Sequence, residues 1–158
     1  MTDSNNISLR PVADGDREFL LRAYASSREI ELSMVPWDEE QKRMFVEHQF
    51  DAQTNYYREK YPQATHDIIL FKGDPAGRSY VDRTESEIAI LDINVLPEFR
   101  RNGIATSVVG DLKAESSGRS VRVYVETFNP SQKLFAELGF VVESQTETHI
   151  LFRWSETA

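Results

Sequence analysis

One stretch of the chain constrains its fold more than any other: an apolar run is followed by arginines and a glycine, and then by a helical pattern. The run from Ile88 to Val95 is apolar at nearly every position except Asp92 and Asn94, which is typical of a strand covered on both faces. After FRRNGIAT (residues 99–106), apolar residues recur at helical spacing until Gly118, and the strand-like VRVYV follows. Strand, helix and strand in this order predict a parallel pair inside a mixed α/β sheet.

The segment FRRNGIAT also predicts an anion-binding site. The first amides of a helix have no partner inside the helix, so here they point back toward residues 101–105. These amides and the positive end of the helix dipole favour phosphate, and Gly103 lets the backbone approach it closely. Arg100 and Arg101 add charge-assisted contacts. The alternative is that Asn102 and Gly103 form only a hairpin turn, but the helical spacing of IATSVVGDLKAE favours the anion site.

The rest of the pattern predicts one domain, residues 1–158, because a chain of this length usually forms a single domain. Apolar residues at three- and four-residue intervals predict a long helix between Pro36 and Pro62, with a break near Asp51. The other expected elements are a strand over Ile7–Pro11, a helix capped by Asp14, strands over Ile68–Phe71 and Arg78–Val81 followed by the turns KGDPAG and DRTESE, helices over Thr106–Ser116 and Pro130–Leu138, and final strands FVVES and HILFRW.

Composition excludes several classes of function. The absence of cysteine excludes disulfides, thiolate metal sites and a covalent cysteine intermediate. The net charge of −8 disfavours general binding to nucleic acid or to an anionic membrane. No apolar run approaches the roughly 20 residues of a membrane helix, and the N-terminus lacks a signal-peptide pattern, so we expect a cytoplasmic protein. His48, His66 and His149 show no metal-ligand spacing, and no metal is expected.

A second motif, ETFNPSQKLFAELGFVVE, predicts a helix with clear ends. Asn129 is a good N-cap, and Pro130 stands at the favoured first position. Gly139 ends the helix, and Phe140 packs back onto it. Taken singly, each of these residues has a purely structural explanation.

Together the two segments resemble the GNAT superfamily of acyl-CoA-dependent N-acetyltransferases. Arg100-x-x-Gly103-x-Ala105 stands where the family has its (Gln/Arg)-x-x-Gly-x-(Gly/Ala) pyrophosphate loop. Asn129 matches a family position, and KLFAELGF stands where the family has LYEKLGF. AGRSYVDR and QFDAQTNYY are similar to a bacterial branch of the family. The resemblance covers nearly the whole chain in the family's order.

The resemblance implies a strongly bent, mostly antiparallel mixed sheet of about six or seven strands, flanked by about four helices. Its parallel central strands, the strand ending at Val95 and VRVYV, would splay apart, and acetyl-CoA would lie in the gap as cosubstrate. Pantetheine would pair with the backbone of residues 93–95, and the pyrophosphate would contact amides of residues 101–106. The implied cofactor-binding residues are Ile93, Asn94, Val95, Arg100, Arg101, Asn102, Gly103, Ile104, Ala105, Thr106, Asn129 and Phe135.

The same resemblance implies that a primary amine attacks the thioester directly in a ternary complex, so that no enzyme nucleophile is needed. The backbone N–H groups of Asn94 and Val95 are candidates for stabilising the oxyanion. The candidate bases are Glu87 and Asp92, whose pKa burial would raise, and Glu126 is a weaker third candidate. The structural alternatives are a solvated turn position for Glu87 and a hydrogen bond that holds the splayed strand for Asp92.

One departure from the family concerns the acid that protonates the leaving thiolate. The family commonly has a tyrosine one turn before Leu-Gly-Phe, whereas this chain has Phe135, which has no proton to donate. Tyr124 is a candidate substitute. Phe135 also suggests the alternative of a non-catalytic acyl-CoA-binding or regulatory domain.

The acceptor amine, on a small molecule or on a protein or peptide, would lie against the first two helices if the family layout holds. Aromatic residues at helical spacing are nevertheless more often core residues. A homodimer stays open, since family members are frequently dimers. The residues that would form the acceptor side are Trp37, Gln41, Phe45, His48, Gln49 and Tyr56.

Overall fold

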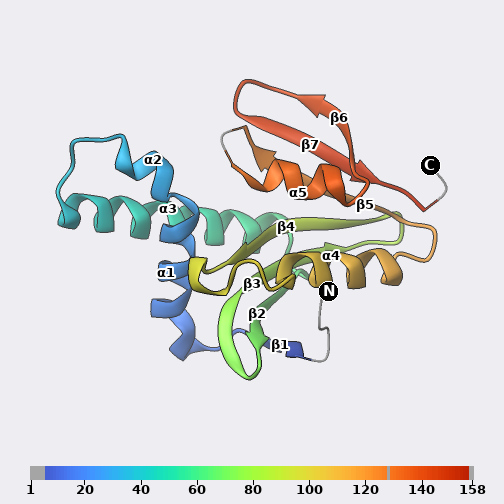
Figure 1. The fold of residues 1–158 in the computed structure, drawn as a ribbon, viewed down its shortest axis with the longest axis horizontal. Helices are drawn as coiled ribbons and strands as arrows, with labels where there is room; N and C mark the ends of the chain where they lie inside the picture. The colour runs from blue at the N-terminus through green and yellow to red at the C-terminus, as the bar shows by residue number, and fades with distance from the viewer. Residues whose placement is uncertain (1–5, 128, 157–158) are drawn as a thin grey trace.

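The computed structural model describes residues 6–127 and 129–156, and within them one mixed sheet of seven strands carries all the helices (Figure 1). The strand order is β1-β2-β3-β4-β5-β7-β6, and only β4 and β5 pair in parallel. The strands are β1 (Ile7–Pro11), β2 (Thr65–Phe71), β3 (Asp74–Arg83), β4 (Glu87–Val95), β5 (Ser120–Glu126), β6 (Val141–Gln145) and β7 (His149–Trp154). The α-helices are α1 (Arg17–Ser27), α2 (Glu29–Ser33), α3 (Glu39–Lys60), α4 (Ile104–Glu115) and α5 (Ser131–Glu137). This is the bent mixed sheet that the sequence predicts.

Two groups of helices cover opposite faces of the sheet, because alternate side chains of a strand point to opposite sides. Leu21, Tyr24 and Phe50, from α1 and α3, pack on Ile68 of β2. The neighbouring residue, Ile69, points to the other face and packs with Ile104 and Val108 of α4. Helix α5 joins α4 on that second face through Phe135, which packs with residues of β5 and β7. The two cores therefore fix α1 and α3 on one side of β4 and α4 and α5 on the other.

A bulge at Leu91 is the feature of the fold that matters most for the site. Val81 lies opposite Ile90 and Tyr80 lies opposite Asp92, so Leu91 is an extra residue in β4. Pairing of β4 with β5 runs from Glu87 to Ile90 and ends there. The extra residue also changes which face the following side chains occupy. Ile90 lies in the core under α4 and α5, whereas Asp92 and Asn94 turn toward α1 and α3.

Several sequence predictions are confirmed, and others are wrong in detail. The first strand and the last have the predicted bounds. Asp14 does not cap the first helix, because α1 begins at Arg17 with Asp16 at the N-cap position. The predicted break in the long helix is wrong: α3 is continuous, and Asp51 pairs with Arg17 at 2.8 Å on its surface. KGDPAG is not a turn throughout, because β3 already begins at Asp74. The fourth helix starts at Ile104, two residues earlier than predicted, and the short helix α2 was not predicted. Among the described residues, no helix is long and apolar enough to cross a membrane.

Candidate active site

The segment between β4 and α4 has the geometry of an anion-binding loop. Gly103 stands at the N-cap of α4 in the left-handed conformation, with φ 70°, and Arg101 also has a positive φ of 69°. The N–H of Ser107 donates to the carbonyl of Gly103 at 2.9 Å. The amides of residues 104–106 therefore precede the first hydrogen bond inside the helix, and they are the donors that an anion at a helix start uses.

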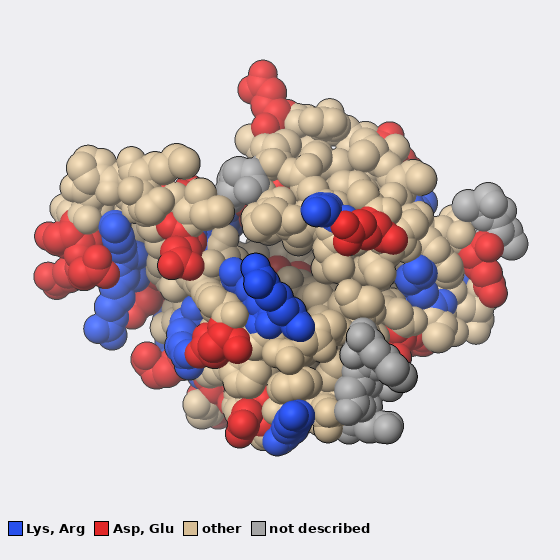
Figure 2. All heavy atoms as spheres, viewed as in Figure 1, with Lys and Arg blue, Asp and Glu red and all other residues tan. Residues whose placement is uncertain are grey.

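Basic side chains gather at this loop, although the chain as a whole has a net charge of −8. Figure 2 shows Lys and Arg side chains gathered over the segment between β4 and α4, beside a recess in the surface, while acidic side chains gather near α2 and the start of α3. Arg100 Nε donates to the carbonyl of Val95 at 3.2 Å, and Asn102 Nδ2 donates to the carbonyl of Phe99 at 2.9 Å. These bonds tie the loop to the end of β4, so the predicted loop residues 100–106 and strand residues 93–95 are brought together.

The end of β4 offers free backbone donors on its β5 side. The N–H of Leu96 donates to the carbonyl of Ala76 in β3 at 2.8 Å. Because N–H directions alternate along a strand, the N–H of Asn94 turns toward β3, and those of Ile93 and Val95 turn toward the splay. Asn94 also uses its side chain elsewhere, since Nδ2 donates to the carbonyl of Ala23 in α1. The backbone of Asn94 is thus unsuited as an oxyanion donor, in contrast to that of Val95.

A cavity of about 390 Å³ lies at the splay, and it is bounded by α1 and α3 from one face and by residues 129–135 of the α5 motif from the other. Strands β4 and β5 also line it. We call it the acceptor cavity. Its polar and aromatic lining comprises Tyr24, Arg28, Gln49, Gln53, Tyr56, Tyr57, Asp92, Tyr124, Glu126, Asn129, Ser131, Phe135 and His149.

Asp92 reaches this cavity as one half of an ion pair. Arg78 Nε donates to Asp92 Oδ2 at 2.8 Å. The Arg78 side chain is 1% exposed and lies 5.4 Å from the ring centre of Phe50, whereas the carboxylate of Asp92 is 27% exposed. Arg78 also donates to Gln53, which lines the same cavity. The cation is thus buried behind the anion, and the anion faces the cavity.

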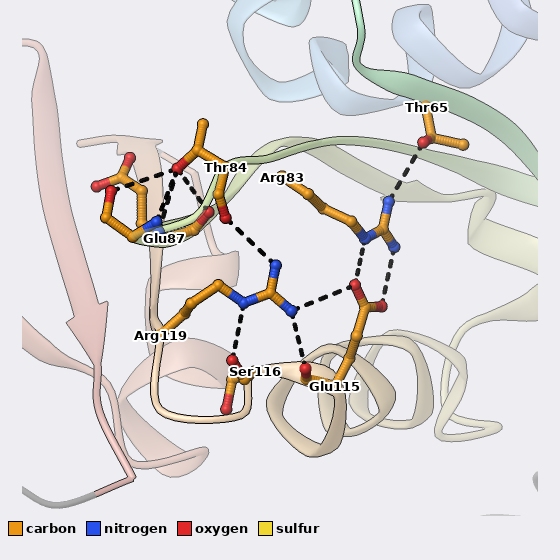
Figure 3. A network of polar contacts seen from close by, with 8 residues as sticks. Thr65, Arg83, Thr84, Glu87, Glu115, Ser116 and Arg119 are labelled. Carbon is orange, nitrogen blue, oxygen red and sulfur yellow. Dashed lines mark hydrogen bonds and ion pairs between the residues drawn. The ribbon is translucent and has the colours of Figure 1, made fainter.

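Glu87, the other candidate base, lies at the opposite end of β4. It stands four residues before Leu91, or about 13 Å along a strand, in the turn where its N–H donates to Thr84 (Figure 3). Burial would raise its pKa, but hydrogen bonds from Arg122 and Arg153 outweigh burial and hold the pKa below the ordinary value. The expectation of a raised pKa is wrong for Glu87, and the residue is an ion-pair partner remote from the splay.

A second ion pair lines the acceptor cavity from the β5 side. The guanidinium of Arg28 donates to Glu126 and, at 3.0 Å, to the hydroxyl of Tyr24. Tyr57 donates its hydroxyl proton to the carbonyl of Leu91, the bulge residue, at 2.8 Å. Burial, with a smaller contribution from Asp92, raises the pKa of Tyr57 well above its ordinary value, so this donor keeps its proton.

The motif around α5 lies at the same cavity. Asn129 Oδ1 accepts from the N–H of Ser131 at 2.9 Å, but α5 begins at Ser131 with Pro130 as its N-cap, so the predicted helix start lies one residue too early. Phe135 is 4% exposed and packs edge-on against Phe140. Tyr124, the candidate acid, is 55% exposed on β5. Both Phe135 and Tyr124 line the acceptor cavity.

The predicted acceptor side is only partly assembled. Gln49 and Tyr56 line the cavity, whereas the rings of Trp37 and Phe45 do not line it and pack against each other in a tilted arrangement with their centres 5.2 Å apart. Sequence reasoning missed four residues, namely Gln53 and Tyr57 of α3, Arg28 at the junction of α1 and α2, and Arg78 of β3. A signal existed for Arg78, because it is a lone charge in the small and apolar stretch AGRSYV, as Asp92 is in its own run. Among the described residues, no group of three His, Asp or Glu side chains is placed to hold a metal ion.

A mixed sheet whose parallel strands part beside an anion loop defines a class of acyl-transferring α/β proteins. Residues 28–140 match the acetyltransferase (GNAT) family, and the chain belongs to that family. Among curated proteins, none matches the sequence significantly.

Solved structures share the fold over nearly the whole chain. The PaiA N-acetyltransferase of Thermoplasma acidophilum, in complex with coenzyme A, is similar with a TM-score of 0.69 and 14% identity, covering 94% of this chain and 98% of that chain. An acetyltransferase from Thermus thermophilus gives a TM-score of 0.67 and 16% identity, with 95% and 97% covered. Naa50 of Arabidopsis thaliana, in complex with the bisubstrate analogue CoA-Ac-MVNAL, has a TM-score of 0.57 and 14% identity, covering 95% of this chain and 99% of that chain.

Proposed function

We propose that the protein transfers an acetyl group from acetyl-CoA to a primary amine by direct attack in a ternary complex. The observation that carries the proposal is the junction of the anion loop at residues 100–106 with the splay that opens after Ile90. A diphosphate on the loop amides would direct the rest of the cosubstrate along β4 into the splay. Complexes of similar structures, one with coenzyme A and one with a CoA bisubstrate analogue, support this reading.

In this proposal the amine nitrogen forms a bond to the thioester carbon, and the carbon–sulfur bond then breaks. The N–H groups of Ile93 and Val95 point toward the splay, where they would stabilise the oxyanion of the tetrahedral intermediate. Asp92 and Glu126 both line the acceptor cavity, and Asp92 would take the proton lost by the ammonium either directly or through water. The thiolate would then take a proton to give free coenzyme A and the acetylated amine.

A non-catalytic acyl-CoA-binding domain is the second candidate, and Phe135 favours it. The side chain at this position packs in the core and has no proton for the thiolate. Tyr124, the candidate acid from the sequence, lines the cavity, although it is more than half exposed.

Free thiol release separates the two candidates. The full chain is incubated with acetyl-CoA and a panel of small amines and peptides with free N-termini or lysines, and thiol is followed with and without each amine. Amine-dependent thiol release together with the acetylated product supports the enzyme. Thermal stabilisation by CoA without turnover supports the binding domain. A protein that shows neither turnover nor stabilisation by CoA would contradict both candidates.

A further inference from the structure

A second cavity, of about 460 Å³, lies on the other side of α3. The α3 residues that line the two cavities alternate along the helix. Asp51, Thr54 and Arg58 line the second cavity. Gln53 and Tyr57 line the acceptor cavity. This alternation fits two opposite faces of one helix. The wall across from α3 is the connection from β1 to α1.

Most polar side chains available in this second cavity are hydrogen-bond donors. Asp51 is already held by two bonds from Arg17, at 2.8 and 3.2 Å. Arg58, in contrast, has no carboxylate partner among the described residues. Asn55 adds an amide, and Asp14 is the remaining acid of the lining. The N–H and O–H donors of Arg58, Asn55 and Thr54 outnumber the acceptor oxygens of Asp14, Asn55 and Thr54.

His66 of β2 completes the set and has a defined tautomer. Burial and the guanidiniums of Arg78 and Arg58 lower its pKa to about 4, against a smaller opposing effect of Asp16, so the ring is neutral near pH 7. The ring stacks on Tyr80 at 4.2 Å. Its Nε2 lies 3.5 Å from Arg78 Nη1, and because a guanidinium only donates, Nε2 accepts. The ring proton is therefore on Nδ1, which makes His66 a further donor.

Arg78 connects the two cavities through the core. It contacts His66 at the second cavity, and it donates to Asp92 and Gln53 at the acceptor cavity. Its side chain is among the largest that are fully buried. A group that binds beside His66 thus has a continuous polar path of two contacts to Asp92.

We propose that the second cavity binds a small oxyanion, a carboxylate or phosphate, and that its occupancy is transmitted through His66 and Arg78 to the acceptor cavity. Oxyanions have only acceptor atoms, which matches a lining of guanidinium, amide and imidazole donors. The binding part is independent of the proposed function, and the transmission part rests on it. The site would make turnover respond to a small anionic metabolite that is not a substrate.

Binding is tested by NMR on the full chain, with inorganic phosphate and succinate as separate probes at constant ionic strength and sodium chloride as the control. We expect at least one probe to perturb the His66 ring signals and to raise the pKa of His66, because a nearby anion favours imidazolium. Arg58→Gln should weaken this binding at least about tenfold. Arg43→Gln is the matched control, since Arg43 lies on the same helix and pairs only with Glu47 among the described residues. A response to both probes indicates a site for oxyanions in general. A response to only one probe shows whether the site takes phosphate or carboxylate.

Two results would overturn the binding part: unchanged His66 signals with both probes, or equal affinity in the wild type and Arg58→Gln. The transmission part is tested with the acceptor amine, whose KM should change when the probe is saturating while the Kd of acetyl-CoA stays constant. An unchanged KM in an active enzyme overturns transmission. Absence of turnover in an enzyme that still binds the probe would instead contradict the proposed function, because the NMR readout needs no catalysis.

Discussion

Arg78 and Asp92 form an ion pair of 2.8 Å in which the cation is almost fully buried and the anion is open to the acceptor cavity. Removing the anion alone leaves a guanidinium in the core, and breaking a buried pair in this way costs about 3–5 kcal/mol. We expect Asp92→Asn to destabilise the fold toward the lower end of that range, because Asp92 is partly exposed. Arg78→Met should do the same.

A double-mutant cycle measured by urea unfolding checks this pair. The double variant should lose at least about 1 kcal/mol less than the sum of the single losses, since residues in contact are coupled by about 0.5–3 kcal/mol. Additive losses would show that the two charges do not depend on each other. The Asp92→Asn variant also reports on function. It should change the KM of the amine, whereas a substitution in the anion loop at residues 100–106 should not.

Two glycines should respond to alanine with opposite signs. An alanine Cβ at Gly77 would lie 2.0 Å from the carbonyl oxygen of Asn94, a backbone atom that has little room to move. Gly77→Ala should therefore cost about 1–3 kcal/mol. Gly110 is exposed within α4 and has no atom within 4 Å of such a Cβ, so Gly110→Ala should stabilise by about 0.5–1 kcal/mol. The midpoints of urea unfolding give both signs, and a stabilised Gly77→Ala would contradict the close approach of β3 and β4.

The sequence was sufficient where local chemistry decides the structure. The loop before α4 was predictable because a glycine with positive φ, a helix start and two arginines are adjacent in the chain. The bulge at Leu91 was not, because it depends on the register between β3 and β4. Asp51 suggested a helix break, yet its cost inside a helix is less than about 1 kcal/mol and Arg17 pairs with it.

The candidate site was predictable only in part for the same reason. The apolar run marked Asp92 by its lone charge, but the partner that fixes it lies 14 residues earlier and on another strand. Tyr57 reaches the cavity from a helix whose spacing looked like ordinary core packing, and Arg28 reaches it from the junction between α1 and α2. A pattern along the chain identifies which residues are unusual, whereas the fold decides which of them meet.

Gly103 should be required for coenzyme binding beyond its effect on stability. A side chain in the left-handed conformation costs about 1–2 kcal/mol, and here it would also stand in the path of the phosphate. We expect Gly103→Ala to raise the Kd of CoA at least about tenfold. Gly118→Ala is the matched control, because Gly118 has φ 89° beyond the other end of α4 with nothing near its Cβ. It should lose similar stability and keep its affinity for CoA, and equal affinities in all three proteins would exclude the loop as the diphosphate site.

Phe135→Tyr should raise turnover if thiolate protonation limits the reaction. A positioned acid contributes about 10²–10⁴-fold in favourable cases, and we expect a gain in kcat of about tenfold or more with little change in the Kd of CoA. Phe135→Leu keeps an apolar side chain and should show no gain. An unchanged kcat in a stably folded Phe135→Tyr would mean that another group, such as Tyr124 or water, already supplies the proton.

His66 should make the fold less stable between pH 6.5 and pH 4. Its pKa is lowered to about 4 in the folded protein, first by burial and then by Arg78 and Arg58, whereas the ordinary value is about 6.5. In this interval the unfolded chain binds a proton that the folded chain does not bind, so the free energy of unfolding falls as the pH is lowered. A shift of this size corresponds to about 3 kcal/mol at most. His66→Gln keeps an acceptor for Arg78 but does not titrate, and its unfolding free energy should fall less over the same interval. Urea unfolding of both proteins at several pH values measures the difference, and parallel curves would mean that the imidazole is as easily protonated in the fold as in the unfolded chain.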